Sequence, residues 1–148
     1  MIKILFVCHG NICRSPMAEF IMKKLAADSG LEDELYIESA AVSREETGND
    51  MYPPAKRKLI EKGIPFSSRR ARTITSADFD GFDSIIVMDS SNLRILERNF
   101  PSSGKVCRLS DFSGGGDIDD PWYSGDFERA FNDIYNGCRG LLEALRDR

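Results

Sequence analysis

The chain has 148 residues, of which 20 are basic and 24 acidic, which gives a formal net charge of -4. This charge argues against a protein that binds nucleic acid or is held on anionic lipid, and the length is that of one ordinary domain, expected over residues 1–148. The apolar start "MIKILFV" is too short for a signal peptide, and no apolar run approaches the roughly 20 residues of a membrane helix, so we expect a cytoplasmic protein.

Strands and helices are predicted to alternate along the chain. The strands are expected over residues 2–7, 35–40, 84–89 and 105–112, and the helices over residues 16–30, 55–62, 90–100 and 127–145. Gly10 and Asn11 end the first strand, and Pro16 stands in the first turn of the first helix. Asp126 is the predicted cap of the last helix, which carries a long apolar face. This alternation predicts an α/β fold with a mostly parallel sheet, whose ligands bind beyond the carboxyl ends of the strands.

The loop after the first strand carries the first functional pattern: Cys8, five further residues, then Arg14 and Ser15. Gly10 and Asn11 can adopt the positive φ angles that turn successive N–H groups inward and form an anion-binding nest. The dipole of the following helix adds positive potential, and the Arg14 guanidinium pairs with phosphate oxygens through two hydrogen bonds. The loop is therefore predicted to cradle an oxyanion.

Cys8 lies at the floor of this cradle, where the N–H groups and the guanidinium favour a thiolate and Ser15 can donate a further hydrogen bond. A thiolate beneath a bound phosphoryl group is placed for in-line attack, which would give a cysteinyl-phosphate. No metal or other cofactor is required, because Arg14 and the loop amides neutralise the developing charge. The alternative is a small buried cysteine with no chemistry. The chain contains no "GxxxxGK[ST]" or "GxGxxG" pattern that would indicate a nucleotide site.

A phosphoryl transfer also needs an acid for the leaving oxygen. The segment "GGGDIDDPWYSG" offers Asp117, Asp119 and Asp120, with Pro121 holding Asp120 in an extended backbone and an aromatic pair beside it. Solvated loop charge is the alternative for all three acids. The only histidine, His9, lies within the cradle loop and is expected to shape its rim.

Three segments, "CHGNICRSPMAE", "RARTITSADFDGFDSIIVMDSSNLRIL" and "DPWY", together resemble the low-molecular-weight protein tyrosine phosphatase family along essentially the whole chain. The resemblance implies a doubly wound, four-stranded parallel sheet with helices on both faces. It implies a metal-independent phosphatase acting on phosphotyrosine-containing proteins, with Cys8 as nucleophile, Arg14 as phosphate clamp, and Asp120 as general acid and then base. The expected phosphate-binding and loop-supporting residues are His9, Gly10, Asn11, Ile12, Cys13, Ser15 and Ser39, with Asn11 in a left-handed conformation. Trp122 and Tyr123 match the aromatic wall of the substrate cleft.

The two loop cysteines also match the family, which implies a reversible Cys8–Cys13 disulfide that protects the nucleophile from further oxidation. A reactive thiolate beside a second thiol is typical of a redox-sensitive site. The alternative is a buried Cys13 that never forms a bridge. Cys107 and Cys138 fall on a predicted strand and on the apolar face of the last helix, and both are expected in the core.

Several residues depart from the family pattern. His9 replaces an apolar residue, and the region around Glu45 lacks the aromatic residue that often closes the cleft, although Tyr52 is close in sequence. Arg69 stands where a histidine of the supporting network is often found. With Arg70 and Arg72, however, it is most simply a solvated basic turn.

Two related activities on a similar fold are the alternatives. A phosphoarginine phosphatase typically has threonine at the position of Ile12, so Ile12 favours phosphotyrosine. A thiol-linked arsenate reductase needs two further redox cysteines close together on a mobile segment, and Cys107 and Cys138 do not fit that pattern. A phosphate carrier or a simple anion-binding module would need neither Asp120 nor an aromatic wall. The protein is expected to be a monomer or a weak dimer.

Overall fold

The computed structural model describes residues 1–100 and 104–147, which contain one sheet of four parallel strands in the order β2-β1-β3-β4. The strands are β1 (Ile2–Cys8), β2 (Leu35–Ala41), β3 (Ser84–Val87) and β4 (Val106–Arg108). The chain leaves β1 toward β2 on one side and later returns to β3 on the other. The strand order therefore reverses between β1 and β3, which is where open α/β sheets bind their ligands.

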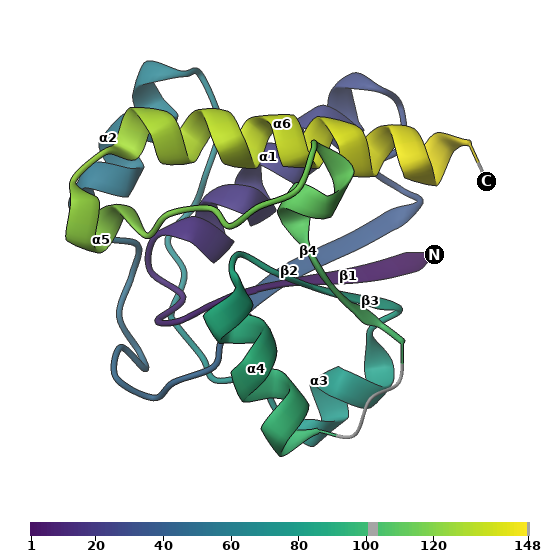
Figure 1. Cartoon of the computed structure of the whole chain (residues 1–148). Helices are drawn as coiled ribbons and strands as arrows, with labels where there is room; N and C mark the ends of the chain where they lie inside the picture. Colours follow the sequence, from purple (N-terminus) through teal and green to yellow (C-terminus); the bar gives the residue numbers. More distant parts are fainter. Residues whose placement is uncertain (101–103, 148) are drawn as a thin grey trace.

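Helices cover both faces of the sheet (Figure 1). One face carries α1 (Arg14–Asp28), α2 (Pro53–Glu61) and α6 (Phe127–Arg146), and the other carries α3 (Ser76–Gly81) and α4 (Ser90–Asn99). The predicted α/β fold, a doubly wound four-stranded parallel sheet with helices on both faces, is thus confirmed. No helix within the described ranges has the length and apolarity needed to cross a bilayer.

The central strand β1 explains why the sheet is covered twice. Ile4 and Phe6 pack with the residues of α1, α2 and α6, whereas Leu5 and Val7 pack with those of α3 and α4. All four side chains are fully buried. Because successive side chains of a strand point to opposite faces, a strand that is apolar at every position from Ile4 to Cys8 needs a layer of helices on each side.

Three elements differ from the predicted ones. The fourth strand ends at Arg108, and residues 109–112 form a 3-10 turn, η1 (Leu109–Phe112), because Leu109 turns into the core beside α6. Helix α3 was not predicted, although Thr75 and Asp78 form a capping box that starts it. The short helix α5 (Pro121–Ser124) was also not predicted, and Asp120 caps it.

The packing of α6 on η1 generates a prediction about stability. A Cβ atom at Gly140 would overlap the carbonyl oxygen of Phe112, which belongs to the backbone and cannot move aside cheaply. Gly140→Ala should therefore lower the free energy of unfolding by about 1–3 kcal/mol, as overpacking of a core typically does. Urea unfolding followed by circular dichroism measures this change.

The matched control is Gly81→Ala, because a Cβ atom at Gly81 would meet only the Lys3 ammonium, at 4.0 Å. The control should leave the unfolding curve nearly unchanged. If Gly140→Ala were as stable as the control, the close approach of α6 to η1 would be wrong.

Candidate active site

The loop between β1 and α1 lies at the carboxyl end of the sheet, where the strand order reverses. Asn11 has a φ of 59° and is the only residue other than glycine with a positive φ in the described parts of the chain. The predicted left-handed conformation of Asn11 is therefore confirmed. Gly10 does not share it, contrary to prediction. Gly10 instead allows the Glu46 side chain to pack closely against the loop backbone, since a Cβ atom at Gly10 would lie 3.3 Å from Cγ of Glu46.

The backbone of this loop presents its N–H groups inward. Those of Asn11 and Ser15 point to Sγ of Cys8, at 3.3 and 3.4 Å. The N–H groups of residues 12–14 have no hydrogen-bond acceptor among residues 1–100 and 104–147, although these residues are largely buried. Cys13 caps α1 without a side-chain hydrogen bond. Unpaired backbone N–H groups at the N-terminus of a helix are suited to bind an anion, so this set of donors can receive one.

The Asn11 side chain fixes the direction of the hydrogen bonds behind Cys8. Its Nδ2 donates to Oγ of Ser15 at 2.7 Å and to Oγ of Ser39 at 3.0 Å, and Ser39 donates to Oε1 of Glu19 at 2.6 Å. Ser15 already accepts a hydrogen bond from Asn11, and its single proton can go to Sγ of Cys8 at 3.1 Å or to the carbonyl of Ala40 at 3.4 Å, of which the sulfur is the nearer. The chain of donors thus ends on the sulfur.

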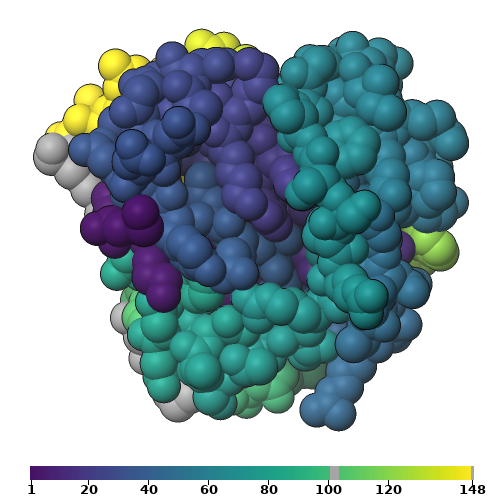
Figure 2. Space-filling view, turned by 180° about the vertical axis from the view of Figure 1, so that it is seen from behind, coloured from purple at the N-terminus to yellow at the C-terminus, as the bar shows by residue number. Residues whose placement is uncertain are grey.

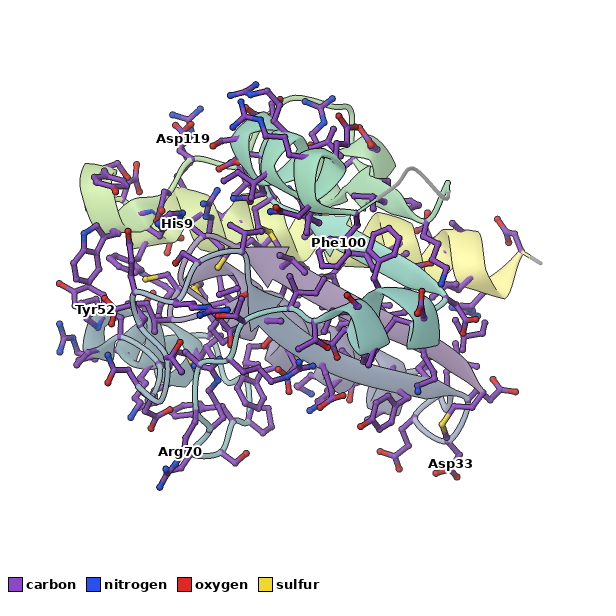
Figure 3. All side chains as sticks on the ribbon, turned by 90° about the horizontal axis from the view of Figure 1, so that it is seen from below. His9, Asp33, Tyr52, Arg70, Phe100 and Asp119 are labelled. Carbon is purple, nitrogen blue, oxygen red and sulfur yellow. The ribbon has the colours of Figure 1, made fainter. Side chains whose placement is uncertain are left out.

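Two arginine residues hold the other end of the Asn11 side chain. The Arg69 guanidinium and the Arg72 N–H both donate to Oδ1 of Asn11, the latter at 3.3 Å. Burial lowers the pKa of Arg69, and its Nη1 is buried without a partner in the described chain. The prediction of a solvated basic turn is therefore wrong for Arg69, and also for Arg72, which pairs with Asp78 at 2.6 Å. Only Arg70 is exposed, and it points away from the molecule (Figure 3).

The segment that carries these arginines reaches the loop from behind. Figure 2 shows it, in teal, lying beside the purple-blue region of α1. The backbone hydrogen bond from the N–H of Ala71 to Asn49, at 2.7 Å, fastens it to the polar connection that precedes α2. The same connection bonds to the cradle loop, since the N–H of Tyr52 donates to Ile12 at 2.9 Å. Two chain segments distant in sequence therefore support one short loop.

Arg14 is 2% exposed, and its guanidinium is held from outside the loop. Its Nη1 donates to Oδ2 of Asp89 at 2.7 Å and to the carbonyl of Ile118 at 2.6 Å, while Nη2 lies 3.4 Å from Oδ2 of Asp120. Burial opposes the charge, but the negative groups of Cys8, Asp120 and Asp89 raise the pKa of Arg14. A permanently charged, fixed guanidinium is suited to bind phosphate oxygens.

The three acids of the glycine-rich segment have separate partners. Asp117 accepts hydrogen bonds from Ser90, and the exposed Asp119 pairs with Arg129 at 3.4 Å. Asp120 lines the cavity above Cys8, and its Oδ1 accepts the N–H of Trp122 at 3.1 Å. Its backbone is extended, as Pro121 predicts, with a φ of -80° and a ψ of 112°. Only Asp120, of these three, therefore reaches the site.

A cavity opens above the cradle. Its lining residues are Cys8, His9, Gly10, Ile12, Cys13, Glu45, Glu46, Asp120, Trp122 and Tyr123. Trp122 is 48% exposed and Tyr123 81% exposed, so both aromatic residues stand at the rim. The Tyr52 ring packs against Trp122, with centroids 4.6 Å apart, and is not part of the lining. Tyr52 thus supports the aromatic wall from outside.

The cysteines are all free thiols. Burial, and then the charge of Cys8, raises the pKa of Cys13 far above its usual range. Cys138 is fully buried in α6, so it belongs to the core as predicted, whereas Cys107 is only partly buried and packs against the core. Burial raises the pKa of Cys107 to about 11. Within the residues that the structure describes, no cluster of three or more metal-ligating side chains was found.

A cysteine beneath an anion cradle, with a fixed arginine and a nearby carboxyl group on a doubly wound α/β fold, defines a phosphatase of the cysteine-dependent class. The family model described as "Low molecular weight phosphotyrosine protein phosphatase" matches residues 3–148. The chain belongs to this family and is a protein-tyrosine-phosphatase.

Known relatives agree over nearly the whole chain. The low molecular weight protein-tyrosine-phosphatase YfkJ of Bacillus subtilis is 40% identical over 99% of this chain and 97% of its own. The crystal structure of YfkJ superposes with a TM-score of 0.95 and 39% identity, covering 99% of this chain and 96% of that chain. The crystal structure of a Drosophila arginine phosphatase has a TM-score of 0.89 and 34% identity, covering 97% of this chain and 98% of that chain.

Sequence reasoning missed three residues of the site. Asp89 follows β3, where the strand "SIIVMD" ends in an acid, and that position was the available signal. Asp89 caps α4 through Oδ1, which accepts the N–H of Asn92 at 2.8 Å, and holds Arg14 through Oδ2. Glu19 carried no local signal, because only the tertiary fold brings it to Ser39. For Arg69 the one signal was its position, which matches a histidine of the family's supporting network, and the fold brings it to Asn11.

The arginine contact generates a prediction about activity. Arg69→Met removes the charged donor to Asn11, so the Asn11 amide and the Ser15 hydroxyl lose their fixed orientation. Because a hydrogen bond to a charged group is worth about 1.5–3 kcal/mol, kcat/KM for an aryl phosphate should fall at least about tenfold. Steady-state hydrolysis of para-nitrophenyl phosphate measures it.

Arg70→Met is the matched control, since Arg70 is exposed and makes no such contact. Its kcat/KM should equal that of the wild type. Equal activity of the two variants would remove Arg69 from the support of the loop.

Proposed function

We propose that this protein hydrolyses phosphotyrosine in proteins through a cysteinyl-phosphate on Cys8, without a metal ion. The observation that carries the proposal lies in the loop whose Asn11 and Ser15 N–H groups point to Sγ of Cys8: within the described ranges, its N–H groups of residues 12–14 have no hydrogen-bond acceptor. Together with the fixed Arg14 guanidinium, these donors are available for the phosphoryl oxygens and would neutralise the charge that develops in transfer.

In the first step the Cys8 thiolate attacks phosphorus in line with the phenolic oxygen. The S–P bond forms as the P–O bond to tyrosine breaks, and the leaving oxygen takes a proton from the Asp120 carboxyl group. Arg14 and the loop amides hold the phosphoryl oxygens throughout. The N–H of Asn11, the N–H of Ser15 and the Ser15 hydroxyl keep Sγ of Cys8 oriented as a nucleophile.

In the second step the same carboxylate acts as a base. Asp120 takes a proton from a water molecule, whose oxygen attacks phosphorus on the side vacated by tyrosine. The S–P bond breaks, which releases inorganic phosphate and returns the thiolate of Cys8. Because Asp120 lines the cavity above Cys8, one carboxyl group can serve both steps.

The lining of the cavity supports an aromatic substrate. Trp122 and Tyr123 stand at the rim and the apolar side chain of Ile12 lies beside the cradle, so a phenyl ring meets apolar surface as it enters. Phosphoarginine, the alternative suggested by the arginine phosphatase neighbour, would bring a charged guanidinium against Ile12. Arsenate reduction has less support, because Cys138 lies in the core and Cys107 packs against it, and neither is beside Cys8.

We infer the cellular compartment from the chemistry of the Cys8 thiol. An enzyme that depends on a free Cys8 thiol suits the reducing cytoplasm, where we place the protein. We infer that residues 1–148 form one domain and that the protein acts as a monomer or weak dimer on phosphotyrosine-containing proteins. Nucleic acid and membranes are not among its proposed partners.

The reaction is tested by hydrolysis of a phosphotyrosine peptide in the presence of a strong chelator. The wild type should keep its full rate with the chelator, and vanadate should inhibit it. Cys8→Ser should lose all measurable turnover, while Cys107→Ser, which changes a cysteine outside the cavity, should retain it. Asp120→Asn should slow hydrolysis by roughly 10²–10⁴ for substrates whose leaving group needs a proton.

Turnover by Cys8→Ser, or loss of wild-type activity in chelator with recovery by a divalent metal, would overturn the proposed mechanism. A clear preference for a phosphoarginine peptide over the phosphotyrosine peptide would overturn the proposed substrate.

Cys13 is proposed to protect the nucleophile. Peroxide would oxidise the Cys8 thiolate to a sulfenic acid with loss of hydroxide, and the Cys13 thiol would then displace water to form a Cys8–Cys13 disulfide. Both cysteines line the same cavity. The raised pKa of Cys13 keeps it a thiol, so only Cys8 reacts first with peroxide.

Peroxide should inactivate the wild type, and dithiothreitol should then restore its activity. Cys13→Ser should be inactivated permanently, because its sulfenic acid is oxidised further, and Cys107→Ser should recover like the wild type. Recovery of Cys13→Ser to the same extent as the wild type would contradict the protective role.

A further inference from the structure

The rim of the cavity also carries a close contact between a histidine and a glutamate. Nε2 of His9 lies 2.9 Å from Oε2 of Glu45, and both residues line the cavity. His9 belongs to the cradle loop, whereas Glu45 belongs to the connection between β2 and α2. Figure 3 places His9 at the same end of the molecule as Tyr52 and Asp119, and Asp33 at the opposite end. The pair therefore lies at the entrance to the active site.

The loop that carries Glu45 is fastened on both sides. The N–H of Ser43 donates to the carbonyl of His9 at 3.1 Å, and the hydroxyl of Thr73 donates to the carbonyl of Ser43 at 2.7 Å. The N–H of Gly48 donates to Ala71 at 2.8 Å. The Glu45 side chain is 70% exposed, yet His9 holds its carboxylate at the rim. Glu45 is thus an accessible charge in a fixed place.

Glu45 is also the acid of the rim that remains available. Oδ2 of Asp120 lies beside Arg14, and Oε2 of Glu46 accepts a hydrogen bond from Asn49 at 2.7 Å. Glu46 is also only half-exposed and packs against Gly10, whereas Glu45 is exposed and, within the described ranges, has no donor to its Oε1. His9 is the only basic side chain among the lining residues, so the entrance is acidic.

We propose that Glu45 is a specificity-determining residue that selects phosphotyrosine flanked by lysine or arginine, and that His9 positions its carboxylate for this contact. The inference rests on the proposed function. With the phosphoryl group at Cys8 and the ring beside Trp122, the peptide backbone of a substrate must pass over the rim. Its neighbouring side chains then meet Glu45, where a cation pairs with the free oxygen and an acid is repelled.

The expected effect is modest, because the contact is exposed to solvent. Exposed ion pairs change an equilibrium by about two- to fivefold, and salt screens them. The peptide with basic flanks should therefore be preferred over one with acidic flanks by at least about twofold in kcat/KM at low salt. The preference should shrink at about 1 M NaCl, where the screening length is about 3 Å.

The test uses three synthetic phosphotyrosine peptides that differ only in the two residues beside the phosphotyrosine, which are lysine, glutamine or glutamate. The readout is the ratio of kcat/KM values between peptides, which is independent of any change in overall rate. Glu45→Gln should bring the ratio of the lysine to the glutamate peptide toward one, and Glu45→Lys should invert the order. Glu32→Gln removes the same charge next to Asp33, far from the site, and should keep the wild-type ratio.

A wild-type ratio of one, or an unchanged ratio in Glu45→Gln and Glu45→Lys, would overturn the role of Glu45 while leaving the proposed function intact. A wild type that hydrolyses none of the peptides, including the neutral one, would instead refute the proposed function. The two failures are therefore distinct.

Discussion

The left-handed backbone of Asn11 is the constraint on which the site depends. At a φ of 59° the chain reverses tightly, and the N–H groups of Asn11 and Ser15 both point to Sγ of Cys8. A residue other than glycine adopts this conformation only at a cost, and here the side chain offsets it. Its amide donates to Ser15 and Ser39 and accepts from Arg69 and Arg72, so a glycine in its place would remove one hydrogen bond from each of these four residues. The hydrogen bonds of the Asn11 side chain thus stabilise the strained backbone conformation that the loop requires.

The charged side chains around the loop leave positive charge close to Cys8 that a bound anion can neutralise. Arg14 and Arg69 bring positive charge close to Cys8, and each is desolvated by burial. Asp89 anchors Arg14 from the far side of the sheet edge, which fixes the guanidinium without filling the cradle. Since burying a charge without compensation is costly, such a site is pre-organised at the expense of local stability and binds a phosphoryl group with little rearrangement.

The order of the main strands and helices was predictable because apolar patterning and turn residues are local signals. The loop from Cys8 to Ser15 was predictable for the same reason, since its function lies in eight consecutive residues. What the sequence hid depends on tertiary packing: Arg69 appears as one of three exposed arginines until the fold places it on Asn11. The turn at Leu109 likewise follows from packing against α6, which outweighs the strand propensity of the segment.

The loop around Cys8 recognises only the phosphoryl group, so selectivity among substrates must come from the rim of the cavity, which carries the aromatic wall and Glu45. The aromatic wall and Glu45 lie on different chain segments, so they can vary without disturbing the cradle. The most direct test of the cradle itself is a crystal structure with vanadate bound. The account predicts vanadium bonded to Sγ of Cys8, with its equatorial oxygens accepting hydrogen bonds from Arg14 and from the N–H groups of residues 12–14. Vanadate bound elsewhere, or a Cys8 side chain turned away from the loop, would contradict it.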